Sequence, residues 1–173
     1  MTRVNLAAKV VFPIINIIQT IPSIALLGAL IPIFGIGVKP ALFALFLYAI
    51  LPLVNNTYVG IKGVDKTLID ASRGIGLTKL QILTNVELPL AFPVILTGLR
   101  TAGVIVIGTA TLAALIGAGG LGDPIFRGVS TVNSQLILLG AVPAALLAVS
   151  FDQILKYIEK RIISRGVSSD TGI

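Results

Sequence analysis

Four long apolar stretches, with one polar segment between the second and the third, constrain the fold of this chain more than any other feature. The stretches cover residues 10–34, 40–59, 93–116 and 135–154. A helix needs roughly 20 apolar residues to cross the hydrocarbon core of a bilayer, and each stretch is apolar around its whole circumference. Because lipid offers no hydrogen-bond partner to an open backbone, such stretches cross a membrane as helices. The prediction is an all-α integral membrane protein with about four transmembrane helices.

The composition agrees with a membrane protein and removes several kinds of chemistry. Only 12% of the residues are charged and 55% are hydrophobic, whereas soluble domains carry about 25% charged residues. The chain contains no Cys and no His, so it lacks thiol chemistry and the commonest metal ligand and general base. It also has no Gly-x-x-x-x-Gly-Lys-Ser/Thr motif for ATP phosphates. We therefore expect that the chain is not itself an enzyme.

The basic residues predict which side of the membrane each segment faces. With four spans, ten Lys and Arg residues fall on one side, and two, Lys39 and Arg127, fall on the other. Cytoplasmic segments are enriched in Lys and Arg, so both termini and residues 63–89 are predicted to be cytoplasmic. The ten residues are Arg3, Lys9, Lys62, Lys66, Arg73, Lys79, Lys156, Lys160, Arg161 and Arg165.

Residues 63–89, GVDKTLIDASRGIGLTKLQILTNVELP, are too polar to lie in lipid but carry ordered helix signals. Thr67 and Asp70 have the spacing of a capping box, which starts a short helix. Gly74 and Gly76 are predicted to end this helix, since glycine adopts the left-handed conformation that a helix end often needs.

A second short helix is predicted after the glycines. Thr78 and Gln81 form a further capping box, and the ring of Pro89 is expected to stop the helix. The segment is therefore predicted to be a helix, a glycine elbow and a second helix, held outside the membrane between two spans. Such an element is typical of a docking site for another protein.

A few polar residues inside or beside the apolar stretches are candidates for lining a transport pathway. Arg100 is the one charge within a span, and it either faces a water-filled cavity or extends its side chain to the cytoplasmic interface. The polar groups around Pro22 either line a pore or satisfy the backbone carbonyl that the proline frees. The candidates are Gln19, Thr20, Ser23, Asn55, Asn56 and Arg100.

The third apolar stretch also carries small residues at helical spacing. In lipid, such a face lets two helix backbones approach closely. It predicts either packing within the chain or an interface with a second subunit. The residues are Gly98, Ala102, Ala110, Ala114 and Ala118.

The polar segment resembles the EAA signature of the permease subunits of bacterial ABC importers. That signature has an acid followed by two small residues, a glycine a few positions later, and an ending of hydrophobic–x–Leu–Pro. The matching residues are Asp70, Ala71 and Ser72, then Gly76, then 86–89, with Asp for Glu, Ser for the second Ala and Val for Ile. The resemblance implies the type I ABC importer permease fold, in which this segment is a coupling loop that seats in a groove of an ATPase subunit.

The resemblance also implies which residues form that coupling interface. They include the signature residues, their neighbours at the glycine elbow and the residues at which the chain re-enters the membrane. The residues are Asp70, Ala71, Ser72, Gly74, Gly76, Leu77, Lys79, Leu88 and Pro89.

Three further stretches, QTIPSIALL (19–27), LYAILPLVNNTY (47–58) and GAGGLGDPIF (117–126), resemble the osmoprotectant branch of these permeases. That branch handles glycine betaine, choline, carnitine and related compounds. The likeness covers nearly the whole chain and implies a permease domain over residues 1–165 with a cytoplasmic tail over 166–173. Members of the family usually carry another transmembrane helix before this point, so we expect that an N-terminal helix is missing here.

The resemblance further implies several partners. ATP and Mg²⁺ would bind to a separate ABC ATPase subunit, so no cofactor is expected on this chain. A second permease subunit, identical or different, would complete the pathway in the inner (plasma) membrane of a bacterium. The predicted outer face offers only Phe34 and Phe126 as aromatics, which is little for cation–π recognition of a quaternary ammonium. A separate extracytoplasmic binding protein is therefore expected to select the solute.

Other interpretations remain open from the sequence. An importer of the same class for an amino acid or another small zwitterion would show the same signals. A self-contained secondary carrier or channel is disfavoured, because ion-coupled carriers usually need an acid or a broken-helix site in mid-membrane, and the acids here lie in loops, termini or span ends. A nucleic-acid partner is not expected, since the helix–Gly–helix segment lies between two spans although it loosely resembles a helix-turn-helix.

Overall fold

The computed structural model describes residues 13, 15, 17 and 19–167, and every regular element within them is helical. This confirms the predicted all-α fold. Two of the helical elements are not α-helices: η1 is a π-helix and η2 is a 3₁₀-helix. The elements are α2 (Ser23–Phe34), α3 (Val38–Lys62), α4 (Lys66–Gly74), α5 (Lys79–Ile82), η1 (Leu83–Glu87), α6 (Leu88–Ala110), η2 (Thr111–Ile116), α7 (Gly122–Ser130) and α8 (Ser134–Val167).

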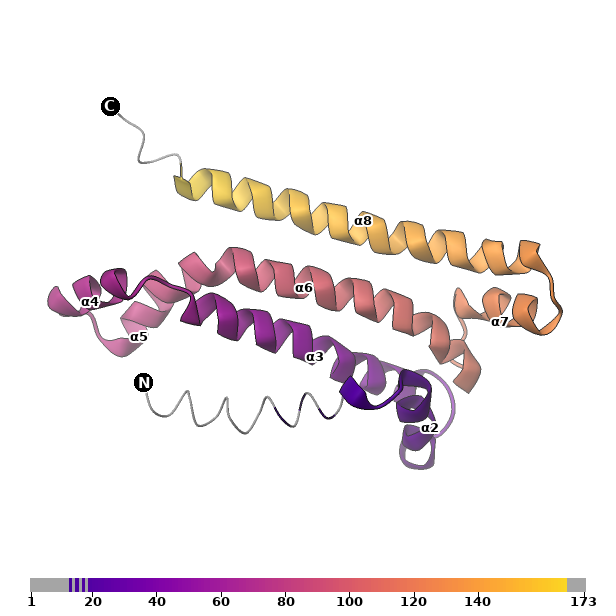
Figure 1. Ribbon diagram of the computed structural model, residues 1–173. Coiled ribbons are helices and arrows are strands. Elements are labelled where there is room, and N and C mark those ends of the chain that lie inside the picture. The colour runs from indigo at the N-terminus through magenta and orange to yellow at the C-terminus, as the bar shows by residue number, and fades with distance from the viewer. Residues whose placement is uncertain (1–12, 14, 16, 18, 168–173) are drawn as a thin grey trace.

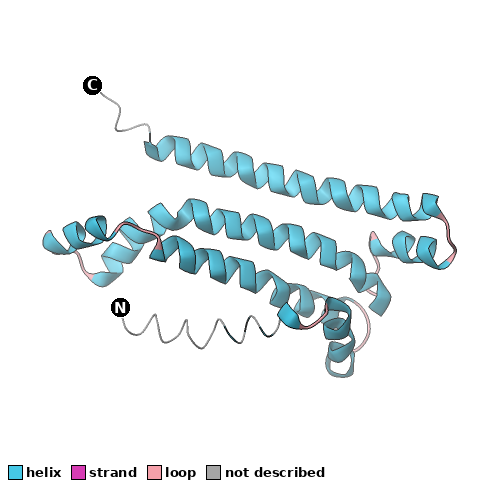
Figure 2. Cartoon of the chain, in the orientation of Figure 1, coloured by secondary structure: helices cyan, strands magenta, loops and turns pink. Residues whose placement is uncertain are grey.

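The three long helices α3, α6 and α8 run side by side and set the long axis of the molecule (Figure 1). Helix α6 lies between the other two and packs on both of them. Helices α4 and α5 lie at one end of this layer, and α2 and α7 lie at the opposite end. Short loops join the helices (Figure 2), so the polar segment 63–89 is held directly against the ends of α3 and α6.

Three helices in the described part of the chain are long and apolar enough to cross a membrane. They contain the second, third and fourth predicted stretches. Each exceeds the roughly 20 residues that a bilayer core requires. The helices are Val38–Lys62, Lys79–Ile116 and Ser134–Arg161.

The first predicted stretch, residues 10–34, is described only in part, because residues 10–12, 14, 16 and 18 lie outside the described residues. The chain leaves the helical conformation at Ile21 and Pro22, and α2 follows as a separate apolar helix of 12 residues. Twelve residues are too few to cross the hydrocarbon core alone. The crossing of the membrane by residues 10–34 stays a prediction.

Small residues bring α3 and α6 into close contact. A Cβ atom on Gly98 would lie 2.6 Å from the Cβ atom of Asn56, and one on Gly60 would lie 3.1 Å from the carbonyl oxygen of Ala91. Ala102 is also buried. Glycine is therefore needed where the two backbones approach, and Gly98 serves packing within the chain.

A second close approach joins α6 to α8. A Cβ atom on Gly103 would lie 1.9 Å from Cε1 of Phe151, so the ring of Phe151 occupies the space above Gly103. This contact sets the axial position of α8 relative to α6. It also places the residues that follow Phe151 in α8 near the middle of α6.

The end of the molecule that holds α2 and α7 is closely packed. Gly37 donates its backbone N–H to the carbonyl of Ile116 at 2.8 Å. A Cβ atom on Gly122 would lie 1.9 Å from the carbonyl oxygen of Thr111, so only glycine fits at the start of α7. The apolar core between α2, α3 and η2 consists of Leu26, Leu27, Leu30, Ala41, Ala44, Tyr48, Ala113 and Ile116.

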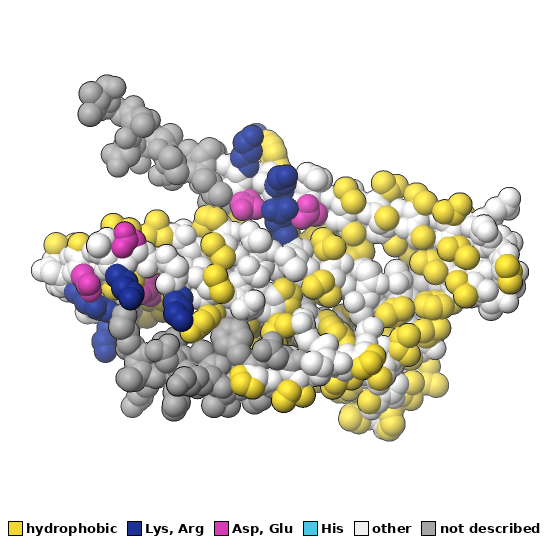
Figure 3. Space-filling model, in the orientation of Figure 1, with side chains coloured by type: hydrophobic (Ala, Val, Ile, Leu, Met, Phe, Trp, Pro, Cys, Tyr) yellow, Lys and Arg dark blue, Asp and Glu magenta, His cyan; other side chains and the backbone are white. Residues whose placement is uncertain are grey.

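The surface separates charged from apolar regions. In Figure 3, Lys, Arg, Asp and Glu side chains gather at the end formed by α4 and α5 and over one part of α8. Elsewhere on the described part of the visible face, apolar side chains are spread among backbone and other side chains. A surface of this kind suits lipid over most of the helices and water at the α4–α5 end.

Candidate functional site

The polar segment begins with a capped helix, but the cap differs from the predicted one. Asp65 is the N-cap residue of α4, and its carboxylate accepts the backbone N–H of Thr67 at 2.9 Å. The predicted capping box of Thr67 and Asp70 is wrong, because both residues lie inside the helix and Asp70 pairs with Arg73 at 2.9 Å. The hydrogen bond from Thr67 holds the pKa of Asp65 below its ordinary value, so this cap is ionised at neutral pH.

Helix α4 ends at a glycine in the left-handed conformation, as predicted. Gly76 has a φ of 87°. The N–H of Leu77 donates to the carbonyl of Ser72, and the N–H of Gly76 donates to the carbonyl of Arg73. These two bonds form a Schellman motif, which satisfies the last carbonyls of the helix. Gly74 is the last residue of α4 and needs no unusual conformation.

The second capping box is confirmed. The hydroxyl of Thr78 accepts the backbone N–H of Gln81, and the side chain of Gln81 accepts the backbone N–H of Thr78. Two otherwise unpaired donors at the start of α5 are thus satisfied reciprocally. The turn between α4 and α5 is therefore fixed by local hydrogen bonds on both sides.

The prediction that Pro89 stops the second helix is wrong. α5, η1 and α6 form one continuous helical stretch, Lys79–Ile116. Pro89 lies in the first turn of α6, directly after η1, where the N–H of Leu88 bonds to the carbonyl of Leu83, five residues back. A proline removes one ordinary i→i−4 donor, and the widened π-turn before it lets the helix pass without a break.

The polar segment has a small apolar core of its own. Val64, Ile69 and Ile82 are buried together, and Leu77 packs against them. This core ties α4 to α5, so the two short helices form one unit at the end of α3 and α6. Ser72 also lies on the buried side and donates its hydroxyl to the carbonyl of Leu68.

Three large apolar side chains of the segment lie outside this core and are exposed. Leu68, Ile75 and Leu80 are 47%, 79% and 70% exposed. We call these three residues the apolar patch. Their side chains take no part in the core of the segment.

The predicted coupling residues divide into two groups in the structure. Leu77 is half-buried and Ser72 is buried, so these two support the segment from within. The others are exposed, with Leu88 and Pro89 at the start of α6 and the rest on the short helices and their elbow. The exposed residues are Asp70, Ala71, Gly74, Gly76, Lys79, Leu88 and Pro89.

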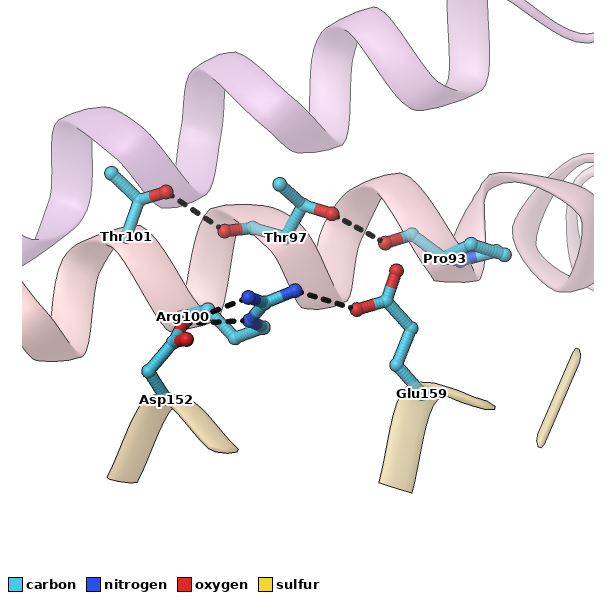
Figure 4. Close-up of polar contacts among 6 residues, drawn as sticks. All are labelled: Pro93, Thr97, Arg100, Thr101, Asp152 and Glu159. Carbon is cyan, nitrogen blue, oxygen red and sulfur yellow. Dashed lines mark hydrogen bonds and ion pairs between the residues drawn. The ribbon is translucent and has the colours of Figure 1, made fainter. Parts of the chain in front are cut away.

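Arg100 is paired within the chain, which the sequence did not reveal. Its Nε and Nη2 atoms contact Oδ1 of Asp152 at 2.9 Å, and its Nη1 atom contacts Oε2 of Glu159 at 3.0 Å (Figure 4). Both acids come from α8. Their spacing of seven residues, two helical turns on one face, was the available signal, but nothing local linked them to α6. We call Arg100, Asp152 and Glu159 the ion-pair cluster.

A groove of about 280 Å³ lies beside this cluster. Its walls come from α6 and α8 and carry both polar and apolar side chains. The residues that line it are Thr97, Arg100, Thr101, Val104, Ile105 and Asp152.

The other predicted pathway residues do not line this groove. Asn56 donates its amide to the carbonyl of Pro52 at 2.8 Å and packs on α6, whereas Asn55 is exposed. Thr20 donates its hydroxyl to the carbonyl of Ile17 at 2.7 Å. Gln19 and Ser23 are half-buried near the break at Pro22. Of the six candidates, Arg100 alone lines this groove.

Taken together, the three long apolar helices and the polar unit at their end define a multi-pass membrane protein. The family described as "Binding-protein-dependent transport system inner membrane component" matches residues 1–164. The chain belongs to this family.

Several curated proteins are similar to this chain over most of its length. The glycine betaine/carnitine/choline transport system permease protein OpuCB of Bacillus subtilis is 45% identical over 167 residues, which are 96% of this chain and 77% of that protein. The choline transport system permease protein OpuBB of the same organism is 46% identical over the same shares. The osmoprotectant import permease protein OsmY of Salmonella typhimurium is 45% identical over 155 residues, 90% of this chain and 66% of that protein.

A solved structure confirms the fold. The MetNI methionine ABC transporter, in an inward-facing conformation, matches with a TM-score of 0.80 and 25% sequence identity. The match covers 89% of this chain and 74% of the MetNI chain. The type I permease fold that the EAA-like segment implied is therefore confirmed.

Proposed function

We propose that this chain is the permease subunit of an ABC importer for small osmoprotectants such as glycine betaine, carnitine and choline. The relatives above carry these solutes in their names at about 45% identity. The observation that carries the coupling role is the apolar patch on a polar segment that already has its own core. A surface that the chain does not need for its own folding is available to a partner.

That partner is a separate ATPase subunit, which binds and hydrolyses ATP with Mg²⁺. The segment 63–89 docks on it with the apolar patch and with Asp70, Ala71, Gly74 and Lys79 around it. Because α5 continues through η1 into α6 without a break, a displacement of the docked segment moves a spanning helix directly. Rigid-body movement of this kind alternates the pathway between inward-open and outward-open states.

The remaining assembly follows from the distribution of charge and exposed surface. Four basic residues lie in the elements that meet at the end with the polar segment, namely at the end of α3, in α4 and at the start of α5. They are Lys62, Lys66, Arg73 and Lys79, and this enrichment makes that end the cytoplasmic one. A second permease subunit, identical or different, completes the pathway, and a separate extracytoplasmic binding protein delivers the solute.

The docking surface is tested by Ile75→Asp. Ile75 is 79% exposed, so the change leaves the fold intact but puts a charge into the apolar patch. We expect the ATPase no longer to co-purify with the permease in detergent, and ATP-driven uptake of radiolabelled glycine betaine to be lost from proteoliposomes that contain the permease, the ATPase and the binding protein.

The matched control is Val132→Asp. Val132 is also a β-branched apolar residue, 91% exposed, but it lies in the loop between α7 and α8 at the other end of the molecule. Its variant should bind the ATPase and transport at the wild-type rate. Normal ATPase binding by the Ile75 variant would refute the proposed docking surface.

The cargo and the transport class are tested separately. Competition of labelled glycine betaine uptake with choline, carnitine and methionine distinguishes an osmoprotectant importer from an amino-acid importer, a distinction suggested by the similarity to a methionine transporter. Solute flux through liposomes that contain this chain alone would instead establish a self-contained carrier or channel.

A further inference from the structure

The ion-pair cluster joins the middle of α6 to the C-terminal half of α8. Arg100 is about 18 Å along α6 from Leu88, at 1.5 Å per residue, which is near the middle of that helix. The side chains of Arg100, Asp152 and Glu159 are 20%, 30% and 19% exposed. Charged side chains within spanning helices are costly in lipid and almost always face a bundle interior or a water-filled cavity. This face of α6 and α8 is therefore directed away from lipid.

The cluster has binding capacity that its internal contacts do not use. A guanidinium has five N–H donors, and the contacts of Arg100 with the two acids do not use all of them. Asp152 is bound through Oδ1 alone and Glu159 through Oε2 alone, which leaves one oxygen of each carboxylate. Unused N–H donors of Arg100 and an unused carboxylate oxygen of Asp152 are therefore available to a molecule in the groove.

The walls of the groove fit a particular kind of solute. Thr97 and Thr101 donate their hydroxyls to backbone carbonyls of α6, so toward the groove they can only accept. Val104 and Ile105 supply apolar surface. The groove thus combines a cation, an anion and apolar contacts within one volume of about 280 Å³.

We propose that this groove is a solute subsite of the translocation pathway, which takes a molecule that carries both a carboxylate and a quaternary ammonium. The free N–H groups of Arg100 bind the carboxylate, and Asp152 faces the ammonium. Val104 and Ile105 contact the methyl groups of the quaternary ammonium. Glycine betaine and carnitine have both charges, whereas choline has only the cation. The subsite rests on the proposed function and adds the residues that would contact the solute.

The test measures equilibrium binding of radiolabelled glycine betaine and choline to the permease–ATPase complex in detergent, without the binding protein. Arg100→Gln should weaken glycine betaine binding about ten-fold or more, because a charged hydrogen bond is lost. The same variant should bind choline as well as or better than the wild type, since Asp152 and Glu159 lose their internal cation. Asp152→Asn should weaken both solutes.

Two further variants keep this result interpretable. Arg127→Gln removes an exposed arginine in α7, outside the groove, and should change neither affinity. The triple variant Arg100→Gln, Asp152→Asn, Glu159→Gln leaves no unpaired charge in the helices, and it should remain folded while it loses the preference for glycine betaine over choline.

A cluster that only holds α6 and α8 together would give another pattern. Equal loss of both solutes in Arg100→Gln, or a wild-type complex that binds neither solute without the binding protein, would overturn the subsite. Either result leaves the proposed function intact if the complete transporter still imports glycine betaine. Failure of the complete wild-type transporter to import any of the three solutes would instead refute the proposed function.

Discussion

At the scale of single residues, the two glycines at the elbow of the polar segment, Gly74 and Gly76, have different tasks. Gly76 occupies the left-handed region at φ 87°, whereas Gly74 is an ordinary helical residue. A Cβ atom would meet nothing within 4 Å at either position. Any difference between substitutions at the two positions therefore reports backbone conformation alone.

We expect Gly76→Ala to destabilise the segment by roughly 1–2 kcal/mol, the cost of the left-handed conformation for a residue with a Cβ atom. Gly74→Ala should be neutral or stabilise it by roughly 0.5–1 kcal/mol, because alanine favours a helix interior. Hydrogen exchange of the amides in α4 and α5 measures both effects in the purified complex. Equal protection in the two variants would contradict the assigned roles.

The sequence predicted residue-level features best where the signal was short-range. The Thr78–Gln81 box and the left-handed Gly76 are both decided within a few residues. The sequence signal for the cap of α4 was ambiguous because Asp65 and Thr67 are both good N-cap residues, two positions apart. Asp70 pairs with Arg73 and not with an N-cap backbone group. The partners of Arg100 depend on how α8 docks on α6, and no local pattern encodes that register.

At the scale of elements, the continuity of α5, η1 and α6 is the main departure from expectation. Pro89 suggested a helix end because a proline usually interrupts the i→i−4 pattern. The π-turn at η1 provides i→i−5 bonding instead. As a result, the segment 63–89 has two different connections to the spanning helices. It continues into α6 as one unbroken helix, and a short turn joins it to the end of α3.

Two glycines inserted between Glu87 and Leu88 should separate docking from transport. The insertion interrupts the continuous helix between η1 and α6 while leaving α4, α5 and the apolar patch unchanged. We expect the ATPase to co-purify normally but uptake of glycine betaine to be lost. The same insertion between Val132 and Asn133, in the loop before α8, is the control and should retain uptake. Unimpaired transport by the first variant would show that α6 does not carry the movement.

At the scale of the whole molecule, the arrangement predicts which end faces the cytoplasm. The chain has no native cysteine, so single substitutions report topology cleanly. Ile75→Cys lies at the α4–α5 end and Val132→Cys at the opposite end, and both side chains are highly exposed. A membrane-impermeant maleimide should label position 132 in intact cells and position 75 only in inverted vesicles. The reverse pattern would invert the proposed orientation.

The spans were predictable as a whole because hydropathy alone defines them, and three of them appear as long helices. The break at Pro22 and the separate helix α2 were less predictable. Apolar residues continue through this region, so hydropathy does not mark the change of direction. The docking of α2 on α3 through Leu26, Leu27 and Leu30 is a tertiary effect that composition cannot show.

The length of α8 has a consequence for the position of the bilayer surface. Its apolar part, Ser134–Arg161, is 28 residues long, or about 42 Å at 1.5 Å per residue. The hydrocarbon layer is about 30 Å thick, so an upright α8 extends about 12 Å, or roughly eight residues, beyond it. With Ser134 at one boundary of this layer, Asp152 lies just inside the other boundary, while Glu159, beside Lys156 and Lys160, reaches the headgroups. The ion pairs of Arg100 with Asp152 and Glu159 thus extend from the hydrocarbon layer to the headgroup layer. The geometry of this part of the protein is therefore sensitive to membrane thickness.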